Sequence, residues 1–422
     1  MGTFDILVVG SGHGGTHAAA TLRSHGFTGS IGLAAAEDEP AYQRPPLSKA
    51  YLSGDMGRER ILLRPRTFWA EHDVDVLGGR RIESVDTDRH HAVTDDGTPI
   101  GFGSLIWAAG SAARTLECPG RELAGIRTLR SRADADAVAA DLPSVSQVLV
   151  VGGGYLGLEV AAALTKLGRQ VTLVEPMDRV LSRVCAEPVS RLFEREHRRH
   201  GVDLRLGVAV AAFRGAAGRV ASAVLTDGSA VPAQLVIVAI GARPVVGPLR
   251  AAGVRGDDGV DVDADGRTSV PGVFAVGDCA AQPSRFAGGA RVRLESVQNA
   301  VDQASAAAAA LAGVPRPVAA PPTFWSDQYD LKLRSVGVTR GCDATVVRGD
   351  PESRSFSVVY LRGGRIAAID SVNVMRDFAQ GRGLVAAAAS VEPSRLADPD
   401  TPLRELLLPV RTCAPIQPRR NE

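Results

Sequence analysis

The feature that most constrains the fold of this chain is a glycine-rich motif that occurs twice. Residues 8–15 are Val-Val-Gly-Ser-Gly-His-Gly-Gly, and residues 150–157 are Val-Val-Gly-Gly-Gly-Tyr-Leu-Gly. A lone Gly-x-Gly-x-x-Gly is a weak signal, which gains meaning between a buried strand and a helix. Both copies have that context, because apolar residues 6–9 and 148–151 precede them and good helix formers follow. The chain is therefore expected to contain two nucleotide-binding units.

The glycines of each copy suit a pyrophosphate. Gly10 and Gly152 are expected to allow a tight turn, while Gly12 and Gly154 let the backbone approach the phosphates. The phosphates would then lie at the positive end of the helix dipole. Two such sites in one chain predict the two halves of a redox relay.

An acidic residue follows the second predicted strand of each unit, at Glu37 and Glu175. Such an acid suits a ribose diol. Glu37 belongs to the acidic cluster 37–39, so the ribose ligand can be displaced by one or two positions. Glu175 would repel a 2′-phosphate, which favours NADH over NADPH. Arg179 and Arg183 follow it and remain able to receive a 2′-phosphate.

Composition indicates a large globular protein. The 422 residues have room for about three domains, and 45% of them are hydrophobic. A formal net charge of +1 without long basic runs predicts neither nucleic acid nor a membrane as a partner. We expect a cytoplasmic protein in a reducing compartment, because no signal peptide or long apolar run is evident. The five cysteines are far apart and predict neither a metal site nor a redox disulfide.

The most specific longer segments of the chain are Arg-Pro-Pro-Leu-Ser-Lys at residues 44–49 and Trp-Ser-Asp-Gln at residues 325–328. With several others, they resemble segments of the ferredoxin reductases of bacterial oxygenase systems, which belong to the pyridine nucleotide-disulfide oxidoreductase superfamily but lack its redox disulfide. Nearly the whole chain takes part in the resemblance. The matching segments are residues 37–49, 105–110, 272–278, 293–300, 324–328 and 396–398.

The resemblance implies an α/β fold with two Rossmann-like dinucleotide-binding domains, arranged as in glutathione reductase, and a C-terminal α+β domain. An NADH domain would be inserted into the FAD domain. The expected FAD-binding domain is residues 1–114 and 245–322, the NADH-binding domain is 115–244, and the C-terminal domain is 323–422.

The composition near the last boundary supports this division. Residues 313–322 are rich in proline and predict a linker. Beyond it, residues 355–360 and 365–372 flank a Gly-Gly turn and predict a β-hairpin in an antiparallel sheet.

The resemblance also implies a set of cofactor-binding residues. Asp278 is expected to bond the ribityl or phosphate region, Ile82 the adenine, and Arg183 the adenosine end of NADH. The full expected set is Gly10, Gly12, His13, Gly14, Gly15, Glu37, Arg44, Lys49, Ile82, Arg130, Asp278, Glu295, Val297, Gly152, Gly154, Tyr155, Leu156, Gly157, Glu175, Arg183, Gly241 and Trp325.

Three residues are expected to act on the reaction itself. In similar reductases the lysine at the position of Lys49 pairs with the glutamate at that of Glu159 beside the flavin. A cation there favours flavin reduction, and hydride passes directly between the cofactors. Trp325 is expected to cover the redox face, although a tryptophan that only anchors the C-terminal domain stays an alternative, as does a solvated charge at Glu159.

The electrons must leave from the flavin, because the disulfide of related enzymes is missing. We expect single-electron transfer to a 2Fe-2S or 3Fe-4S ferredoxin, bound transiently through charge, that serves a haem-thiolate monooxygenase or a ring-hydroxylating dioxygenase. Arginine-rich residues 58–66 and 291–293 are candidate docking surfaces, with service to the flavin as the alternative for Arg293. Alternatives are a reductase of rubredoxin or a small organic acceptor, and an NADH-sensing flavoprotein. The protein is expected to be a monomer or a weak dimer.

Overall fold

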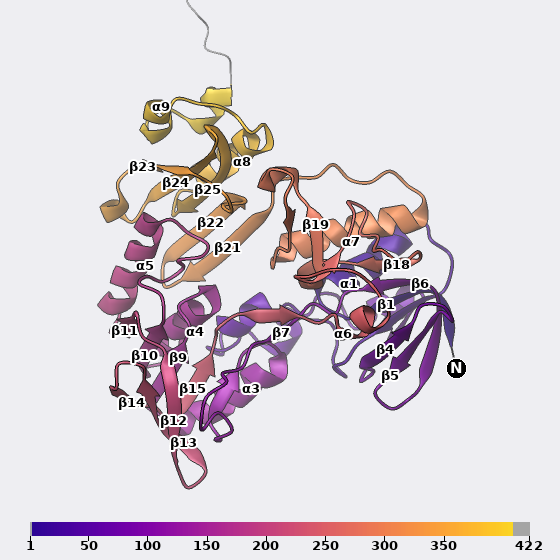
Figure 1. Ribbon diagram of the computed structural model, residues 1–422, viewed down its shortest axis with the longest axis horizontal. Coiled ribbons are helices and arrows are strands. Elements are labelled where there is room, and N and C mark those ends of the chain that lie inside the picture. Colours follow the sequence, from indigo (N-terminus) through magenta and orange to yellow (C-terminus); the bar gives the residue numbers. More distant parts are fainter. Residues whose placement is uncertain (1, 408–422) are drawn as a thin grey trace, which may run out of the picture.

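The computed structural model describes residues 2–407 (Figure 1). Its first sheet carries the first glycine motif. The strand order is β3-β2-β1-β6-β5-β4, with β18 beside β6. β1, β2, β3, β6 and β18 pair in parallel, whereas β4 and β5 form an antiparallel edge. The strands are β1 (Thr3–Val9), β2 (Ile31–Ala34), β3 (Val74–Leu77), β4 (Ile82–Asp86), β5 (His91–Thr94), β6 (Pro99–Trp107) and β18 (Val273–Ala275).

Helices α1 (His13–Ser24) and α7 (Val297–Ala312) pack against one another on this sheet (Figure 1). The alanines of α7 let the two helices approach closely, since Ala304, Ala307 and Ala308 are fully buried in the core they share with β1. The short helix α2 (Phe68–Glu71) precedes β3. The strand and helix predicted around the first motif are therefore confirmed.

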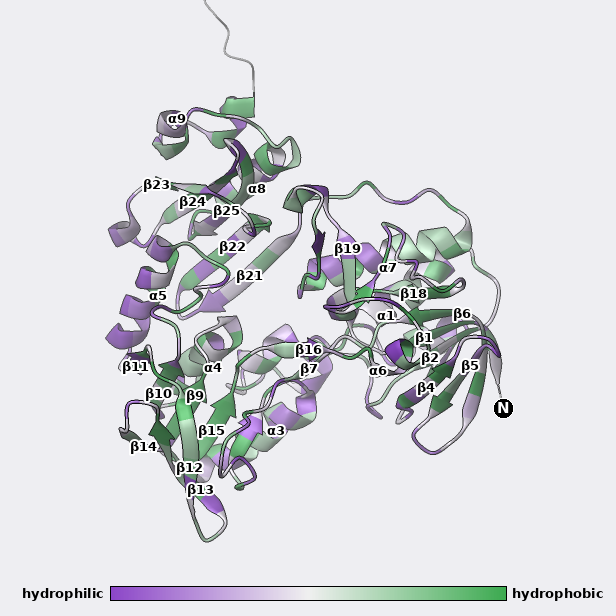
Figure 2. Ribbon diagram, viewed as in Figure 1, coloured by the Kyte–Doolittle hydropathy of each residue, from purple (hydrophilic) through white to green (hydrophobic). Residues whose placement is uncertain are grey.

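The second sheet carries the second glycine motif and is entirely parallel, in the order β11-β10-β9-β15-β8. Its central strands are apolar and covered on both faces (Figure 2). Leu149 and Val151 contact an antiparallel meander, and Val148 and Val150 contact the helices. The elements are β8 (Ile126–Thr128), α3 (Arg132–Asp141), β9 (Gln147–Val151), α4 (Tyr155–Lys166), β10 (Gln170–Glu175), α5 (Glu187–Arg199), β11 (Asp203–Leu206), β12 (Val210–Ala216), β13 (Arg219–Leu225), β14 (Ala230–Pro232) and β15 (Leu235–Val238).

The chain crosses between these two units twice, and the crossings pair with each other. β7 (Ser111–Ala113) leaves the first unit, and β16 (Ala242–Pro244) returns to it as the antiparallel partner (Figure 2). The return leads into α6 (Gly247–Ala251), β17 (Val260–Asp261), β19 (Ala280–Pro283) and β20 (Arg291–Val292).

A third, antiparallel sheet of order β21-β22-β25-β24-β23 begins after residues 313–322, which form no helix or strand. The predicted hairpin is present, with Gly363 and Gly364 at φ of 55° and 74° in its turn. Its first strand runs two residues further than expected. The elements are β21 (Thr323–Gln328), β22 (Leu331–Gly337), β23 (Ala344–Arg348), β24 (Phe356–Arg362), β25 (Arg365–Val372), α8 (Met375–Ala386) and α9 (Pro393–Ala397).

One core joins the three parts of the molecule. Leu47 and Ile61 from the first unit, Phe193 from the second, and Leu333 and Phe356 from the third sheet belong to a single buried cluster. β21 also packs on α4 (Figure 1). The two glycine loops and the start of the third sheet are thus held in fixed positions around one space.

Candidate functional site

A cavity of about 1520 Å³ lies between the two glycine loops, and residues of both loops and of β21 line it. It is lined by every cofactor-binding residue expected from the sequence except Gly15, Gly152 and Gly157. A single space therefore connects the two predicted nucleotide sites.

At these three positions glycine is required because the surrounding backbone leaves no room for a side chain, and not because the residue contacts a ligand. A Cβ on Gly15 would lie 1.8 Å from the carbonyl oxygen of Gly10, and one on Gly157 would lie 1.9 Å from that of Gly152. Gly10 and Gly152 have φ of 108° and 109°, and a Cβ on either would lie 2.4 Å from the carbonyl oxygen of the residue that follows the neighbouring strand. These four glycines let each helix start directly behind its strand.

The starts of α1 and α4 fit a phosphate group. Their N-cap residues, Gly12 and Gly154, are extended, and neither provides a side-chain cap to the helix. Neither helix has an acidic residue in its first turn, and a Cβ on either N-cap would meet no atom within 4 Å. The free backbone N–H groups therefore face the cavity, where an anionic diphosphate would satisfy them.

Glu37 lies three residues beyond the end of β2 rather than on the strand itself. Its carboxylate accepts hydrogen bonds from the Tyr42 hydroxyl at 2.6 Å and from Arg44 at 3.1 Å. Burial raises the pKa of Tyr42 to about 12, so this hydroxyl keeps its proton. Of the acidic cluster 37–39, only Glu37 lines the cavity.

Glu175 ends β10, and its carboxylate braces the second glycine loop. It accepts the backbone N–H of Gly153 at 2.6 Å and that of Met177 at 2.9 Å. Arg179 is committed elsewhere, because its guanidinium donates to the carbonyls of residues 182 and 185 and to a serine hydroxyl. Arg183 is exposed and lines the cavity. The expectation that Arg179 can receive a 2′-phosphate is therefore wrong.

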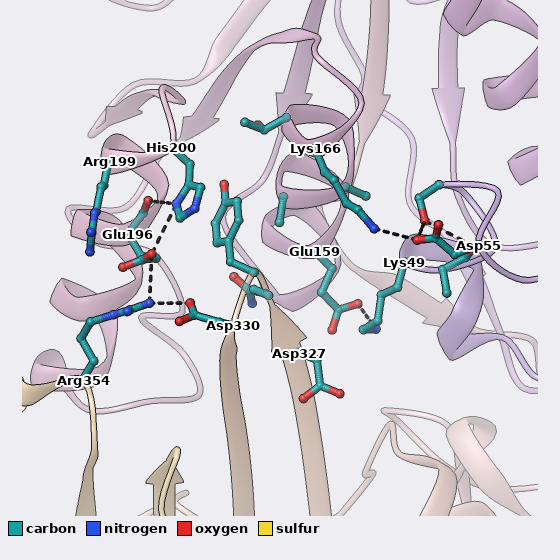
Figure 3. Close-up of a pocket in the computed structure, with 17 residues that line it drawn as sticks. Lys49, Asp55, Glu159, Lys166, Glu196, Arg199, His200, Asp327, Asp330 and Arg354 are labelled. Atoms are coloured by element: carbon teal, nitrogen blue, oxygen red, sulfur yellow. Dashed lines mark hydrogen bonds and ion pairs between the residues drawn. The ribbon is translucent and has the colours of Figure 1, made fainter.

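Lys49 and Glu159 form an ion pair, with 2.5 Å between Lys49 Nζ and Glu159 Oε2 (Figure 3). Glu159 is only 7% exposed. The hydroxyls of Ser48 and Ser326 also donate to its carboxylate, at 2.6 and 2.7 Å. A buried carboxylate needs such donors. The reading of Glu159 as a solvated charge is therefore wrong.

Trp325 and its neighbour Phe324 line the cavity from β21. Trp325 is only partly buried, which disfavours a purely core role. The ring of Phe324 lies 4.3 Å from that of Tyr155, measured between centroids, and the Tyr155 hydroxyl lies 3.4 Å from Cys185 Sγ.

Sequence reasoning did not single out Ser48, Ser326 and Phe324. A signal was available, because Ser48 directly precedes Lys49 in one family-like block and the other two lie in or beside the Trp-Ser-Asp-Gln block. Ser48 and Ser326 face Glu159 across 111 and 167 residues of chain.

Asp278 lies in the turn after β18 and accepts hydrogen bonds from Ser111 at 3.0 Å and Arg130 at 3.1 Å. Nearby, Arg293 donates to the Asp278 carbonyl at 2.9 Å and to Glu295 at 2.6 Å. Burial lowers the pKa of His13, the first residue of α1, to about 4, so this imidazole is neutral near pH 7.

The arginines named as candidate docking surfaces are largely paired within the chain. Arg293 also bonds Asp258, and its side chain is only 10% exposed. Other ion pairs in these segments join Arg58 to Asp136, Arg66 to Glu59 and Arg291 to Asp261. Of residues 291–293 only Arg293 lines the cavity, and both arginines of the segment are paired with carboxylates, so the segment is not a free basic patch.

Cysteine chemistry is not prominent in residues 2–407. Their four cysteines are free, and burial raises the pKa of Cys279 to about 12. Cys413 lies outside the described residues. Within the described part of the chain no cluster of three or more histidine, cysteine or acidic residues could hold a metal, and no helix is long and apolar enough to cross a membrane.

Two family models match the chain. Residues 4–304 match the model described as pyridine nucleotide-disulphide oxidoreductase, and residues 323–407 match that of the reductase C-terminal region.

Individual proteins match over almost the full length. The 5,5′-dehydrodivanillate O-demethylase ferredoxin reductase subunit of a Sphingobium species is 51% identical over 96% of this chain and 99% of its own. A ferredoxin–NAD(P)+ reductase of a Sphingomonas species is 48% identical, covering 96% and 98%. The crystal structure of a covalent putidaredoxin reductase–putidaredoxin complex superposes with a TM-score of 0.93, at 37% identity over 96% of this chain and 98% of the other.

The expected fold class, enzyme class and cofactors are confirmed by these matches. The chain belongs to the pyridine nucleotide-disulphide oxidoreductases, and within them to the ferredoxin reductases that use FAD and NAD(P)H.

Proposed function

We propose that this chain transfers hydride from NADH to FAD and passes the electrons singly to a ferredoxin. The observation that carries the proposal is the single cavity between the two glycine loops, with Lys49, Glu159 and Trp325 on its wall. A cavity shared in this way allows the reacting ends of two dinucleotides to meet, and positioning at contact supplies much of the catalysis of hydride transfer.

FAD is assigned to the first loop. Gly12 and the start of α1 would receive its pyrophosphate, Glu37 its adenosine ribose, and Asp278 its ribityl or phosphate region. When bound, the isoalloxazine accepts the hydride and gives up its electrons one at a time. Lys49 would supply a fixed positive charge beside that ring, and Glu159 would hold the ammonium in place.

NADH is assigned to the second loop, with Glu175 as the ribose acceptor. The support is the carboxylate already fixed at the loop by the N–H of Gly153, together with the commitment of Arg179 to other partners. A 2′-phosphate would face this anion, so NADH is preferred over NADPH.

The partner is assigned as a 2Fe-2S or 3Fe-4S ferredoxin of an oxygenase system, either a haem-thiolate monooxygenase or a ring-hydroxylating dioxygenase. The support comes from the relatives of the chain, which include a demethylase ferredoxin reductase subunit and a reductase crystallised with putidaredoxin. A cytoplasmic location suits such a partner.

We assign the FAD domain to residues 1–114 and 245–322, the NADH domain to 115–244 and the C-terminal domain to 323–422, of which residues 1 and 408–422 lie outside the described residues. The paired crossings β7 and β16 support the first two boundaries, and the irregular stretch before β21 supports the third.

A coupled assay tests the proposal. Purified holoprotein, NADH and cytochrome c are mixed with each of a panel of ferredoxins, and the control omits the ferredoxin. Rapid, ferredoxin-dependent cytochrome reduction is expected, with NADH preferred over NADPH. Activity with only rubredoxin or a small organic acceptor would overturn the assignment of a ferredoxin as the partner. Slow turnover with every acceptor and an NADH-induced dimer in light scattering would indicate a sensor instead.

A further inference from the structure

We propose that a buried chain of hydrogen bonds, running through Tyr329, His197, Gln328 and Ser326, positions the Glu159 carboxylate and thereby tunes the reduction potential of the bound flavin. These four residues are positioning residues, because none of them reaches the cofactor cavity. The inference rests on the proposed function, in which Lys49 and Glu159 lie beside the flavin.

The chain of hydrogen bonds is continuous, and it is buried except at Tyr329, which is partly buried. Ser326 Oγ lies 2.7 Å from Glu159 Oε1, and Gln328 Nε2 lies 3.1 Å from Ser326 Oγ. His197 Nε2 lies 2.9 Å from Gln328 Oε1, and the Tyr329 hydroxyl lies 3.1 Å from His197 Nδ1. Ser326, Gln328 and His197 are each at most 1% exposed. Unpaired polar groups at such depth would be costly, so each link contributes to holding the next.

The period of a strand explains how the chain arises. Ser326 and Gln328 are two residues apart on β21 and therefore point to the same side of the sheet, toward helices α4 and α5. Glu159 comes from α4 and His197 from α5. The chain thus ties the third sheet to two helices of the second unit at the point where the ion pair needs support.

The hydrogen bonds have one direction. The amide oxygen of Gln328 can only accept, so His197 Nε2 carries the hydrogen and Nδ1 accepts from Tyr329. Burial lowers the pKa of His197 to about 4, which keeps this ring neutral near pH 7. The amide nitrogen of Gln328 then donates to Ser326, whose own hydrogen goes to Glu159.

The opposite direction would lose a bond. With the amide of Gln328 turned around, Ser326 would face two acceptors, the amide oxygen and the Glu159 carboxylate, with a single hydrogen. The chain of donors therefore ends at Glu159. Because an amide passes a proton poorly, the Gln328 link makes this chain an orienting device and not a proton path.

The ion pair has particular need of orientation. Lys49 and Glu159 line the cofactor cavity on one side and a second cavity, of about 680 Å³, on the other (Figure 3). Packing therefore supports this pair only in part, and its geometry depends on hydrogen bonds. Removing a donor from Glu159 leaves its negative charge less compensated near the flavin, which should lower the reduction potential.

The test measures the potential of the bound flavin in anaerobic equilibrium titrations against a reference dye. Ser326→Ala removes a donor from Glu159 and is expected to lower the potential, shifting the equilibrium by up to about tenfold toward the oxidised form, or about 30 mV for two electrons. Gln328→Met leaves the Ser326 hydroxyl without the amide that orients it toward Glu159, and is expected to lower the potential in the same direction. Ser326→Thr keeps the hydroxyl and should restore the wild-type value. The matched control is Ser357→Ala, a fully buried serine of β24 that bonds Ser371 and Asp377, and it should leave the potential unchanged.

The Lys49→Met variant distinguishes a failure of the positioning chain from a failure of the proposed function. If Lys49→Met lowers the potential while Ser326→Ala and Gln328→Met do not, the positioning chain is overturned and the proposed function stands. An equal shift in Ser357→Ala would also overturn the chain. If Lys49→Met has no effect, the placement of the ion pair beside the flavin is wrong. Gln328→Met does not touch Glu159, so it keeps the test valid if Ser326→Ala fails to fold.

Discussion

At the scale of single residues, the central feature of the cofactor cavity is the ion pair of Lys49 and Glu159. Its carboxylate has three donors in contact, namely Lys49, Ser48 and Ser326. Bonds to charged groups contribute about 1.5 to 3 kcal/mol each when they replace solvent. A pair held so firmly provides a charge of fixed position, as hydride transfer to a flavin requires.

Replacing Lys49 with Met should slow flavin reduction by NADH about tenfold to a hundredfold, because the positive charge beside the ring is lost and Glu159 is left buried without its cation. Anaerobic stopped-flow absorbance measures this rate. The melting temperature of the variant checks that the fold is retained. Reduction at the wild-type rate would mean that the charge is incidental.

Glu175 sets the choice of nucleotide. The double variant Glu175→Ala, Met177→Arg removes the anion and adds a cation at a half-exposed position, so the ratio of kcat/KM for NADPH to that for NADH should rise at least about tenfold. Glu175→Gln is the control, since its amide oxygen can still accept the N–H of Gly153. An unchanged ratio in the double variant would show that the ribose is held elsewhere.

Two histidines, the fully buried His197 and the partly buried His13, make the free energy of unfolding dependent on pH. Burial lowers the pKa of both His13 and His197 to about 4, below the ordinary value of 6.5. Between pH 6.5 and pH 4 the unfolded chain binds more protons than the folded one. The free energy of unfolding is therefore highest above about pH 6.5, and the contribution of the neutral histidines to it is lost as the pH falls toward 4. The free energy of unfolding in urea should decrease over this range. His197→Gln should make the decrease shallower, and an identical slope would contradict the assignment.

At the scale of elements, the two strand–turn–helix units are subject to nearly the same backbone constraints. Gly10 and Gly152 share a φ near 108°. At Gly15 and Gly157 an added Cβ would collide with the carbonyl oxygen of the first glycine of the same motif. These constraints are local, which is why both units could be predicted from the glycine spacing and the flanking apolar residues.

Substitutions in the first loop should separate folding from binding. Gly15→Ala would place a methyl group 1.8 Å from a backbone oxygen, so α1 must move, and the apoprotein should lose about 2 kcal/mol of stability together with FAD binding. Gly12→Ala meets no protein atom within 4 Å and should leave the apoprotein intact while weakening FAD binding. Urea melts and flavin titrations measure both effects. Equal destabilisation by the two variants would contradict this division of roles.

Contacts between elements were harder to predict from the sequence. Ser48 and Ser326 meet at Glu159 only because η1 (Pro45–Ser48), α4 and β21 converge there. Arg293 was expected to belong to a docking surface or to serve the flavin, and the fold pairs it with Asp258 and Glu295. A charged side chain in a loop does not identify a docking surface until the fold shows which groups it pairs with.

At the scale of the whole molecule, the two nucleotide units and the third sheet share one core and surround one cavity. The sequence predicted two nucleotide sites, and it took the tertiary structure to show that they open into the same space. The resemblance to known reductases supplied the division into three parts, while the third sheet places Trp325 at the cavity wall.

A single-turnover experiment tests most directly whether this cavity works as a relay. The FAD-loaded protein is mixed anaerobically with one equivalent of NADH, and an oxidised ferredoxin is added afterwards in excess. We expect the flavin absorbance to bleach and then recover as two ferredoxins are reduced for each NADH, because a hydride carries two electrons. Flavin that stays oxidised with NADH, or bleached flavin that no ferredoxin reoxidises, would contradict the account.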